Sequence, residues 1–182
     1  MDSQERVQLL VDGSNLYHRL RECIPSDSLL QYQYDTFARW LAGTRVLVGK
    51  TYYIGVVRAA PSDARAQALR RDQQRLFAAL GRMKWRISRG FILHADSGFH
   101  EKGVDVQIAV DLLAGAYEDR YDTAILVSSD TDLIPALAKV RAMGKKVEYV
   151  GFSHKPSLGL ITNSDIRRLL TADDLSPFFL HA

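Results

Sequence analysis

Residues 7–17, VQLLVDGSNLY, carry the pattern that first indicates the fold class of this chain. The first five of these residues, 7–11, form a short apolar run that predicts a buried strand, and Asp12 followed by glycine predicts a turn where the strand ends. A helix is expected next, with Ser14 or Asn15 near its N-cap. A buried strand that leads directly into a helix is typical of the first unit of a parallel α/β sheet.

The same alternation continues along the chain. Further strands are expected over residues 45–57, 85–93, 123–127 and 146–150. Further helices are expected over residues 35–43 with Asp35 as cap, 61–80 with Leu69 on its apolar stripe, 104–116, 133–143, and a last short helix capped by Ser164 or Asp165. Residues 94–103 predict a polar loop, and helix 104–116 is apolar on most of its surface, which predicts a central position.

This order predicts an α/β fold, a three-layer α/β/α sandwich with a mostly parallel, Rossmann-like central sheet. With 182 residues, no repeat and no long linker, the chain is expected to form a single domain over 1–182 with its core at about 7–170. The tail PFFLHA at 177–182 is apolar enough to dock either on the core or on a partner.

Composition excludes several classes of protein. Cys23 is the single cysteine, so neither an internal disulfide nor a cysteine zinc cluster can form within the chain. The apolar runs are too short to span a bilayer, and the N-terminus lacks the pattern of a secretory signal. A cytoplasmic protein without membrane contact is therefore expected.

The net charge of +3 is small, but the basic residues are unevenly distributed. Between residues 65 and 89 the chain carries Arg65, Arg70, Arg71, Arg75, Arg82, Lys84, Arg86 and Arg89, with Asp63 and Asp72 as nearby acids. Such a surface can bind phosphates by Coulomb attraction and counterion release, or it can simply be a solvated helix face. The charges alone favour neither interpretation.

Aspartates follow the predicted strands at the end of the sheet where open parallel sheets bind ligands. Asp12 follows the first strand, Asp105 begins a helix after the third, and Asp130 and Asp132 follow the fourth. Neighbouring carboxylates repel each other unless a cation lies among them. Oxygen ligands of this kind favour Mg²⁺ or Mn²⁺, which polarise a phosphate and activate a water for phosphodiester hydrolysis.

Each aspartate also has a purely structural interpretation. Asp12 can be a turn residue, Asp130 or Asp132 an N-cap, and Asp105 a favourable charge at a helix N-terminus. Asp105 is the most informative, because an aspartate above an apolar helix stripe is costly without a partner. Asp111 lies on a more polar face of the same helix, which indicates a structural role.

Further polar residues accompany the acids. Asn15 can orient Asp12 or a bound water, or it can cap the helix. The candidates for substrate contacts are Lys102, Ser129, Arg70 and Arg71. The candidate metal ligands are Asp12, Asp105 and Asp130, and the candidate catalytic set adds Asn15 and Asp132.

Three segments together resemble the NYN domain family of PIN-like nucleases, and within it the bacterial LabA-like group. They are VDGSNLY at 11–17, KGVDVQIAVDLL at 102–113 and SSDTDLIPALAKVRAMGKKVEYVG at 128–151. The resemblance implies a PIN-like fold and ribonuclease chemistry dependent on Mg²⁺ or Mn²⁺. It also implies metal-binding acids at Asp12, Asp105 and Asp130, with Asp132 as a further acid, and it makes a homodimer possible.

Three functions compete on this sequence. The first is a metal-dependent ribonuclease, and the second is a non-catalytic module that binds RNA or a protein partner. The third is an aspartyl-phosphate phosphatase using DTDLI at 130–134, which is weak because its aspartate pair normally follows the first strand. Neither phosphate-binding glycine motif of nucleotide-binding proteins is present, which disfavours dinucleotide binding.

Overall fold

The computed structural model describes residues 4–23, 29–57, 63–95 and 98–179, and for residues 29, 91–95 and 98–101 it describes the backbone alone. Seven strands form one sheet in the order β4-β3-β2-β1-β5-β6-β7. All neighbours are parallel except β3 and β4, which are antiparallel. The strands are β1 (Arg6–Asp12), β2 (Val46–Val56), β3 (Arg86–Ala95), β4 (Gly98–Lys102), β5 (Thr123–Val127), β6 (Lys146–Phe152) and β7 (Ile166–Leu170).

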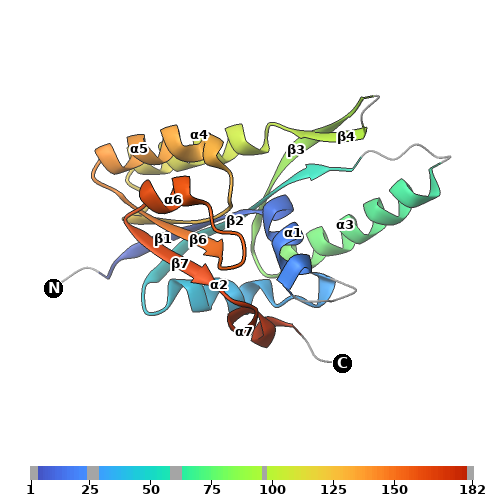
Figure 1. Cartoon of the computed structure of the whole chain (residues 1–182), viewed down its shortest axis with the longest axis horizontal. Helices are drawn as coiled ribbons and strands as arrows, with labels where there is room; N and C mark the ends of the chain where they lie inside the picture. The colour runs from blue at the N-terminus through green and yellow to red at the C-terminus, as the bar shows by residue number, and fades with distance from the viewer. Residues whose placement is uncertain (1–3, 24–28, 58–62, 96–97, 180–182) are drawn as a thin grey trace.

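Helices cover both faces of this sheet, so the predicted α/β/α sandwich is confirmed (Figure 1). The helices are α1 (Gly13–Cys23), α2 (Tyr34–Ala42), α3 (Ala64–Arg82), α4 (Val104–Tyr117), α5 (Ile134–Ala142), α6 (Leu158–Thr162) and α7 (Ala172–Leu175). Three short 3₁₀ turns complete the described chain: η1 (Leu29–Gln31), η2 (Thr131–Leu133) and η3 (Ser176–Phe178). Within the described residues no helix is long and apolar enough to cross a membrane.

Successive side chains of β1 point to opposite faces of the sheet, and each face carries its own layer of the hydrophobic core. Val7, Leu9 and Val11 pack on the side of α1, α2 and α7, whereas Leu10 packs on the side of α4, α5 and α6. Phe178 and Phe179, which belong to the apolar tail, are buried against the first layer, and residues 180–182 lie outside the described residues. Both layers are anchored on the strand that ends at Asp12.

Two predicted elements were wrong. The expected polar loop at 94–103 instead continues β3 and adds β4, with Phe91 paired to Lys102 in an antiparallel ladder. The expected last helix is strand β7, which pairs in parallel with β6 from Glu148↔Ile166 onward. In both segments the backbone gains a ladder of hydrogen bonds from a neighbouring strand, a contact that local sequence does not reveal.

Details of three helices also differ from expectation. Asp35 lies in the first turn of α2 and pairs with Lys50 and Arg39, while Gln33 occupies the N-cap. On α3, Leu69 is about half exposed, at 49%. Helix α4 is not central: it has a buried side and an exposed apolar side, made of Val106, Val110 and Tyr117.

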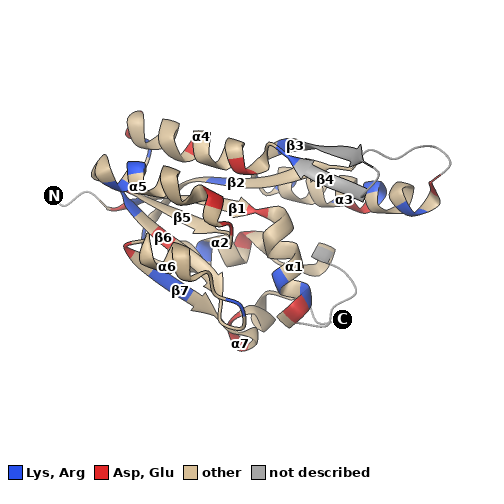
Figure 2. Cartoon of the chain, turned by 45° about the horizontal axis from the view of Figure 1, so that its top comes forward, with Lys and Arg blue, Asp and Glu red and all other residues tan. Residues whose placement is uncertain are grey.

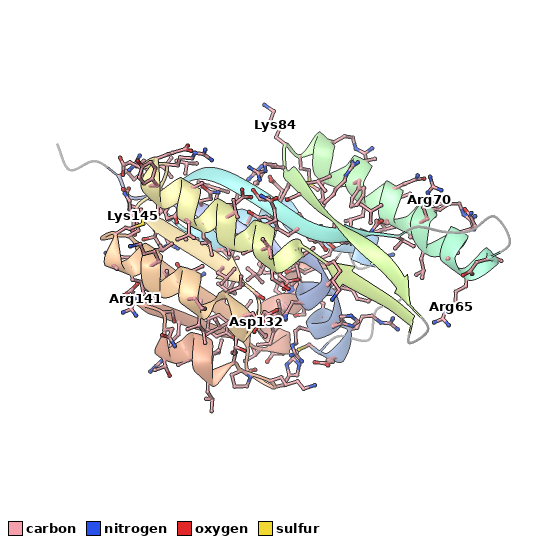
Figure 3. The ribbon with its side chains drawn as sticks, turned by 90° about the horizontal axis from the view of Figure 1, so that it is seen from above. Arg65, Arg70, Lys84, Asp132, Arg141 and Lys145 are labelled. Carbon is pink, nitrogen blue, oxygen red and sulfur yellow. The ribbon has the colours of Figure 1, made fainter. Side chains whose placement is uncertain are left out.

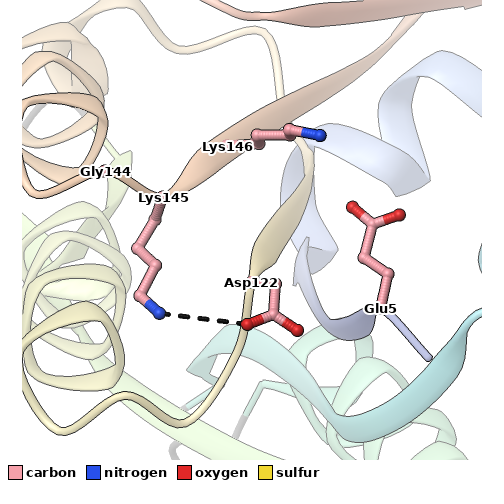
Figure 4. A pocket seen from close by; sticks show the side chains of 5 residues that line it. All are labelled: Glu5, Asp122, Gly144, Lys145 and Lys146. Carbon is pink, nitrogen blue, oxygen red and sulfur yellow. Dashed lines mark ion pairs between the residues drawn. The ribbon is translucent and has the colours of Figure 1, made fainter. Parts of the chain in front are cut away.

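At the amino ends of the strands the chain forms a charged pocket of about 370 Å³ (Figure 4). It is lined by Glu5, Asp122, Gly144, Lys145 and Lys146, and Asp122 lies 4.0 Å from the Lys145 ammonium. The backbone N–H of Arg6 and its guanidinium both donate to Asp122, each at 2.8 Å. These bonds tie the start of β1 to the start of β5.

The Arg6 hydrogen bonds lower the pKa of Asp122 from 3.8 to about 2. The carboxylate therefore stabilises the fold above its unfolded pKa, and this contribution is lost as the pH falls from 3.8 to about 2. We expect the free energy of unfolding to fall less steeply across this window in Asp122→Asn than in the wild type. Urea unfolding at several pH values on either side of the window checks this, and equal slopes for both proteins would contradict it.

Candidate metal and active site

Asp12 is the last residue of β1 and is almost fully buried, at 6% exposure. Helix α1 begins at the next residue, and the backbone N–H of Asn15 donates to Asp12 Oδ1 at 3.0 Å. Asp12 is therefore the N-cap of α1, and Ser14 and Asn15, which were expected near the cap, lie in the first turn of the helix. The cap fixes the orientation of this carboxylate at the end of the strand.

Gly13 makes this arrangement possible. A Cβ at this position would lie 2.4 Å from the Tyr52 ring and 2.7 Å from the carbonyl oxygen of Tyr53. Residue 53 is also the register partner of Asp12 in the neighbouring strand β2. Only a residue without a side chain lets α1 start this close to β2, so Gly13 determines where Asp12 lies.

Ser128 joins the first aspartate to the others. It follows β5 directly, and because Val11 pairs with Val127, it lies beside Asp12. Its hydroxyl donates to Asp12 Oδ2 at 2.9 Å and accepts from the backbone N–H of Asp130 at 3.1 Å. Ser128 was not among the predicted site residues, although its position directly after the strand adjacent to β1 is a signal that the sequence contains.

Asp130 and Asp132 follow in the same turn. Asp130 Oδ1 accepts the backbone N–H of Asp132 at 2.9 Å, so Asp130 caps the 3₁₀ turn η2. The capping role in the structural interpretation of Asp130 is thus confirmed, whereas Asp12, interpreted as a turn residue, caps a helix instead. Asp132 is exposed, and Figure 3 shows it between the helices near the middle of the molecule.

Asp105 is half-buried in the first turn of α4, after Gly103 in a left-handed conformation (φ 82°). Helix α4 contacts both η2, which holds Asp132, and β1, which ends at Asp12. In Figure 2 the acidic segments at the end of β1, in the turn after β5 and at the start of α4 lie toward the same part of the molecule. The three stretches are brought to one end of the sheet, as expected.

A buried network around Asp111 fixes α4 on the sheet. Its carboxylate accepts from the Tyr53 hydroxyl at 2.7 Å and from Gln107 at 3.2 Å, and it pairs with Arg86 of β3. Burial and the hydrogen bond to Asp111 raise the pKa of Tyr53. The structural role expected for Asp111 fits these contacts, which hold the helix that carries Asp105.

Two oxygens in this region are buried without a hydrogen-bond partner among the described residues: Asn15 Oδ1 and Ser129 Oγ. Both side chains were predicted to belong to the site. A buried acceptor without a donor costs free energy, so such atoms indicate a place where a cation or water can bind.

The described part of the chain contains no group of three or more His, Cys, Asp or Glu side chains close enough to hold a metal ion. The hydrogen bonds connect Asp12 and Asp130 through Ser128, and Asp105 lies on the adjoining helix. Coordination of Mg²⁺ or Mn²⁺ by all three aspartates therefore stays a prediction.

The predicted substrate contacts are dispersed. Lys102 is exposed at the end of β4, and Arg70 and Arg71 are exposed on α3. Figure 3 shows Arg70 on α3, well away from Asp132. The sequence-based set therefore falls into an acidic centre and a separate basic helix.

Comparison with known proteins places this geometry in context. A crystal structure of a protein of unknown function from Vibrio parahaemolyticus matches with a TM-score of 0.73, at 24% identity and over 99% of both chains. None of the curated proteins matches the chain. The model of the NYN domain matches residues 6–167. The chain belongs to the NYN domain family.

This NYN domain spans all the elements described above from β1 to the start of β7. NYN domains are a family of PIN-like nucleases, which makes RNA the substrate class to expect. The acidic end of the sheet, with Asp12, Ser128 and Asp130 in hydrogen-bond contact, lies wholly inside the matched segment.

Proposed function

We propose that this NYN domain is a metal-dependent ribonuclease that hydrolyses RNA phosphodiester bonds. Mg²⁺ or Mn²⁺ would be held by Asp12, Asp105 and Asp130 at the carboxyl end of the parallel sheet. The observation that carries the proposal is the partly buried chain of hydrogen bonds that joins Asp12 to Asp130 through Ser128 in a nuclease-family fold.

The residues present suit such an ion. All candidate donors are oxygens, and Asn15 Oδ1 and Ser129 Oγ are buried without partners in the described structure. Mg²⁺ characteristically takes one or two carboxylates and completes its shell with waters and substrate phosphates, so a sparse acidic set is sufficient. When bound, the ion polarises the phosphate and lowers the pKa of a water.

Hydrogen bonds from backbone and side-chain donors orient the candidate carboxylates. Asp12 is held by two donors, Ser128 Oγ and the Asn15 backbone N–H, so its carboxylate needs no rearrangement to act. Asp130 is oriented by the N–H of Asp132. The exposed carboxylate of Asp132 is available to accept a proton from the attacking water.

Lys102 lies three residues before Asp105, on the strand that leads into α4. Its exposed ammonium suits an RNA phosphate next to the cleaved bond, where it would add Coulomb attraction.

The LabA-like branch, a cytoplasmic location and the pairing of two copies remain predictions. Sedimentation of the purified protein tests the last of these.

The test is cleavage of labelled single-stranded RNA with Mg²⁺, with Mn²⁺ and with chelator. We expect the wild type to cleave with either metal and to stop with chelator, and Asp105→Asn to be folded but inactive. Asp119→Asn is the matched control, because Asp119 is exposed at the opposite end of the sheet and its positive φ of 53° suits asparagine.

Two results would overturn the proposal. Undiminished cleavage by Asp105→Asn would remove this aspartate from the site. RNA binding that persists in chelator, with no cleavage under either metal, would make the protein a non-catalytic binding module.

A further inference from the structure

A second hollow, of about 390 Å³, lies between α3 and the outer strands β2 and β3. It is lined by Val56, Arg70, Gln73, Gln74, Phe77 and Arg89. The described residues that line it include two arginines and no acid. This composition favours an anionic occupant.

The side chains of the hollow combine charge with a flat surface. The Arg89 guanidinium lies over the Phe77 ring, 5.0 Å from its centroid. Planar guanidinium and aromatic groups are the surfaces on which unpaired RNA bases stack. Arg70 is exposed at the rim and can reach a phosphate.

The floor of the hollow is fixed. The Gln73 side chain donates to the carbonyl oxygen of Gly55 at 2.8 Å and accepts from the backbone N–H of Val57 at 3.0 Å. These bonds hold α3 against the end of β2. The neighbouring Gln74 is exposed and has an amide that can contact a base edge.

Not all of the basic stretch contributes to this surface. Arg75 pairs with Asp72 at 3.2 Å, and Arg86 pairs with Asp111 on the opposite side of the sheet. Figure 3 shows Arg65 and Arg70 on different sides of α3. The structure thus selects Arg70 and Arg89 from a run of eight basic residues.

The hollow reaches the same end of the sheet as the acidic site. Val56 is the last residue of β2, and Tyr53, three residues earlier, is the register partner of Asp12. Three residues of strand and one strand spacing place the backbones of Asp12 and Val56 about 11 Å apart. A short stretch of unpaired RNA that passes over this edge of the sheet can therefore reach both places.

We propose that this hollow binds one nucleotide of single-stranded RNA beside the cleavage site. Arg70 contacts the phosphate, and the base stacks on the pair formed by Arg89 and Phe77. The proposal rests on the proposed function for the identity of the ligand, but binding in the hollow requires neither metal nor cleavage. A duplex would not supply a free base face, so unpaired RNA is preferred.

Fluorescence anisotropy of a labelled single-stranded RNA about 12 nucleotides long, measured in chelator, tests this binding directly. We expect Arg89→Ala to raise Kd about tenfold, as the loss of one stacked base does. Arg89→Lys keeps the positive charge but loses the planar guanidinium, so it should weaken binding nearly as much as Arg89→Ala. Arg70→Ala should weaken binding and reduce its salt dependence.

Arg65→Ala is the matched control, since it removes the same charge from the same helix outside the hollow. If Arg70→Ala and Arg89→Ala bind RNA no more weakly than Arg65→Ala, the hollow is not an RNA site, and the ribonuclease proposal is unaffected. If Arg70→Ala and Arg89→Ala lose as much affinity for duplex RNA or for polyglutamate as for single-stranded RNA, the hollow is a general anion site and the proposal is overturned. Intact binding without cleavage under any metal would contradict the proposed function alone.

Discussion

We expect Asp12→Asn to lose RNA cleavage by roughly a hundred- to a thousandfold, because stabilisation of charge by a bound metal is worth several kcal/mol. The same change should leave the fold nearly intact. Asparagine is as good an N-cap as aspartate, so its oxygen can still accept the Asn15 N–H. The Ser128 hydroxyl can reverse its role and accept from the new amide.

Asp12→Ala separates the two roles of this residue. It removes both acceptors, which leaves the Ser128 hydroxyl and the Asn15 N–H without their partner, at a cost of about 1–3 kcal/mol. Urea unfolding followed by tryptophan fluorescence measures stability, and the labelled-RNA assay measures cleavage. An Asp12→Asn protein that cleaves at the wild-type rate would show that Asp12 is a helix cap and nothing more.

A large loss of stability is expected for Glu148→Gln. Glu148 lies in β6 with a side chain only 1% exposed, between Arg45 at 2.7 Å and Arg168 at 2.8 Å. Arg45 also donates to the carbonyl oxygens of Leu41 and Ala42, so the carboxylate joins β6 and β7 to the end of α2. Breaking a buried ion pair from one side leaves uncompensated charge, which costs about 3–5 kcal/mol.

For a protein of this length such a loss lowers Tm by about 10 °C. The matched control is Glu118→Gln, since Glu118 is exposed and, among the described residues, forms an ion pair only with Arg120. Exposed pairs contribute about 0–1 kcal/mol, so this variant should unfold close to the wild type. Equal unfolding curves for the two variants would show that the buried pair contributes no more than a surface pair.

The sequence predicted the central strands because their apolar runs are unbroken. β1 and β5 have both faces covered by helices, so their patterns depend little on the rest of the fold. The edges were harder to predict. In β7 the residues Arg167 and Leu169 are exposed, and the pattern IRRLL suits a short helix as well as a strand. Its pairing with β6 decides the matter, and that contact is nonlocal.

The acidic site was predicted in part. The residues were placed at the correct end of the sheet, because the position of each aspartate after a strand is a local feature of the sequence. The hydrogen bonds that connect them were not predicted. Ser128 matters because its hydroxyl lies within hydrogen-bond distance of Asp12, the last residue of a neighbouring strand. Arg89 matters because its guanidinium lies over the Phe77 ring. Both depend on strand register, which the sequence alone does not specify.

The helix cap made by Asp12 has a consequence for the interpretation of relatives. Because this carboxylate also holds the start of α1, selection for folding alone would retain an acid or asparagine there long after chemistry had ceased. The same holds for Asp130, which caps η2. The side chain of Asp132 is exposed and caps no helix or turn in the described structure, so this position would be the first to change in relatives that have lost catalysis. We expect a relative's residue at this position to distinguish a working enzyme from a descendant that keeps only its scaffold.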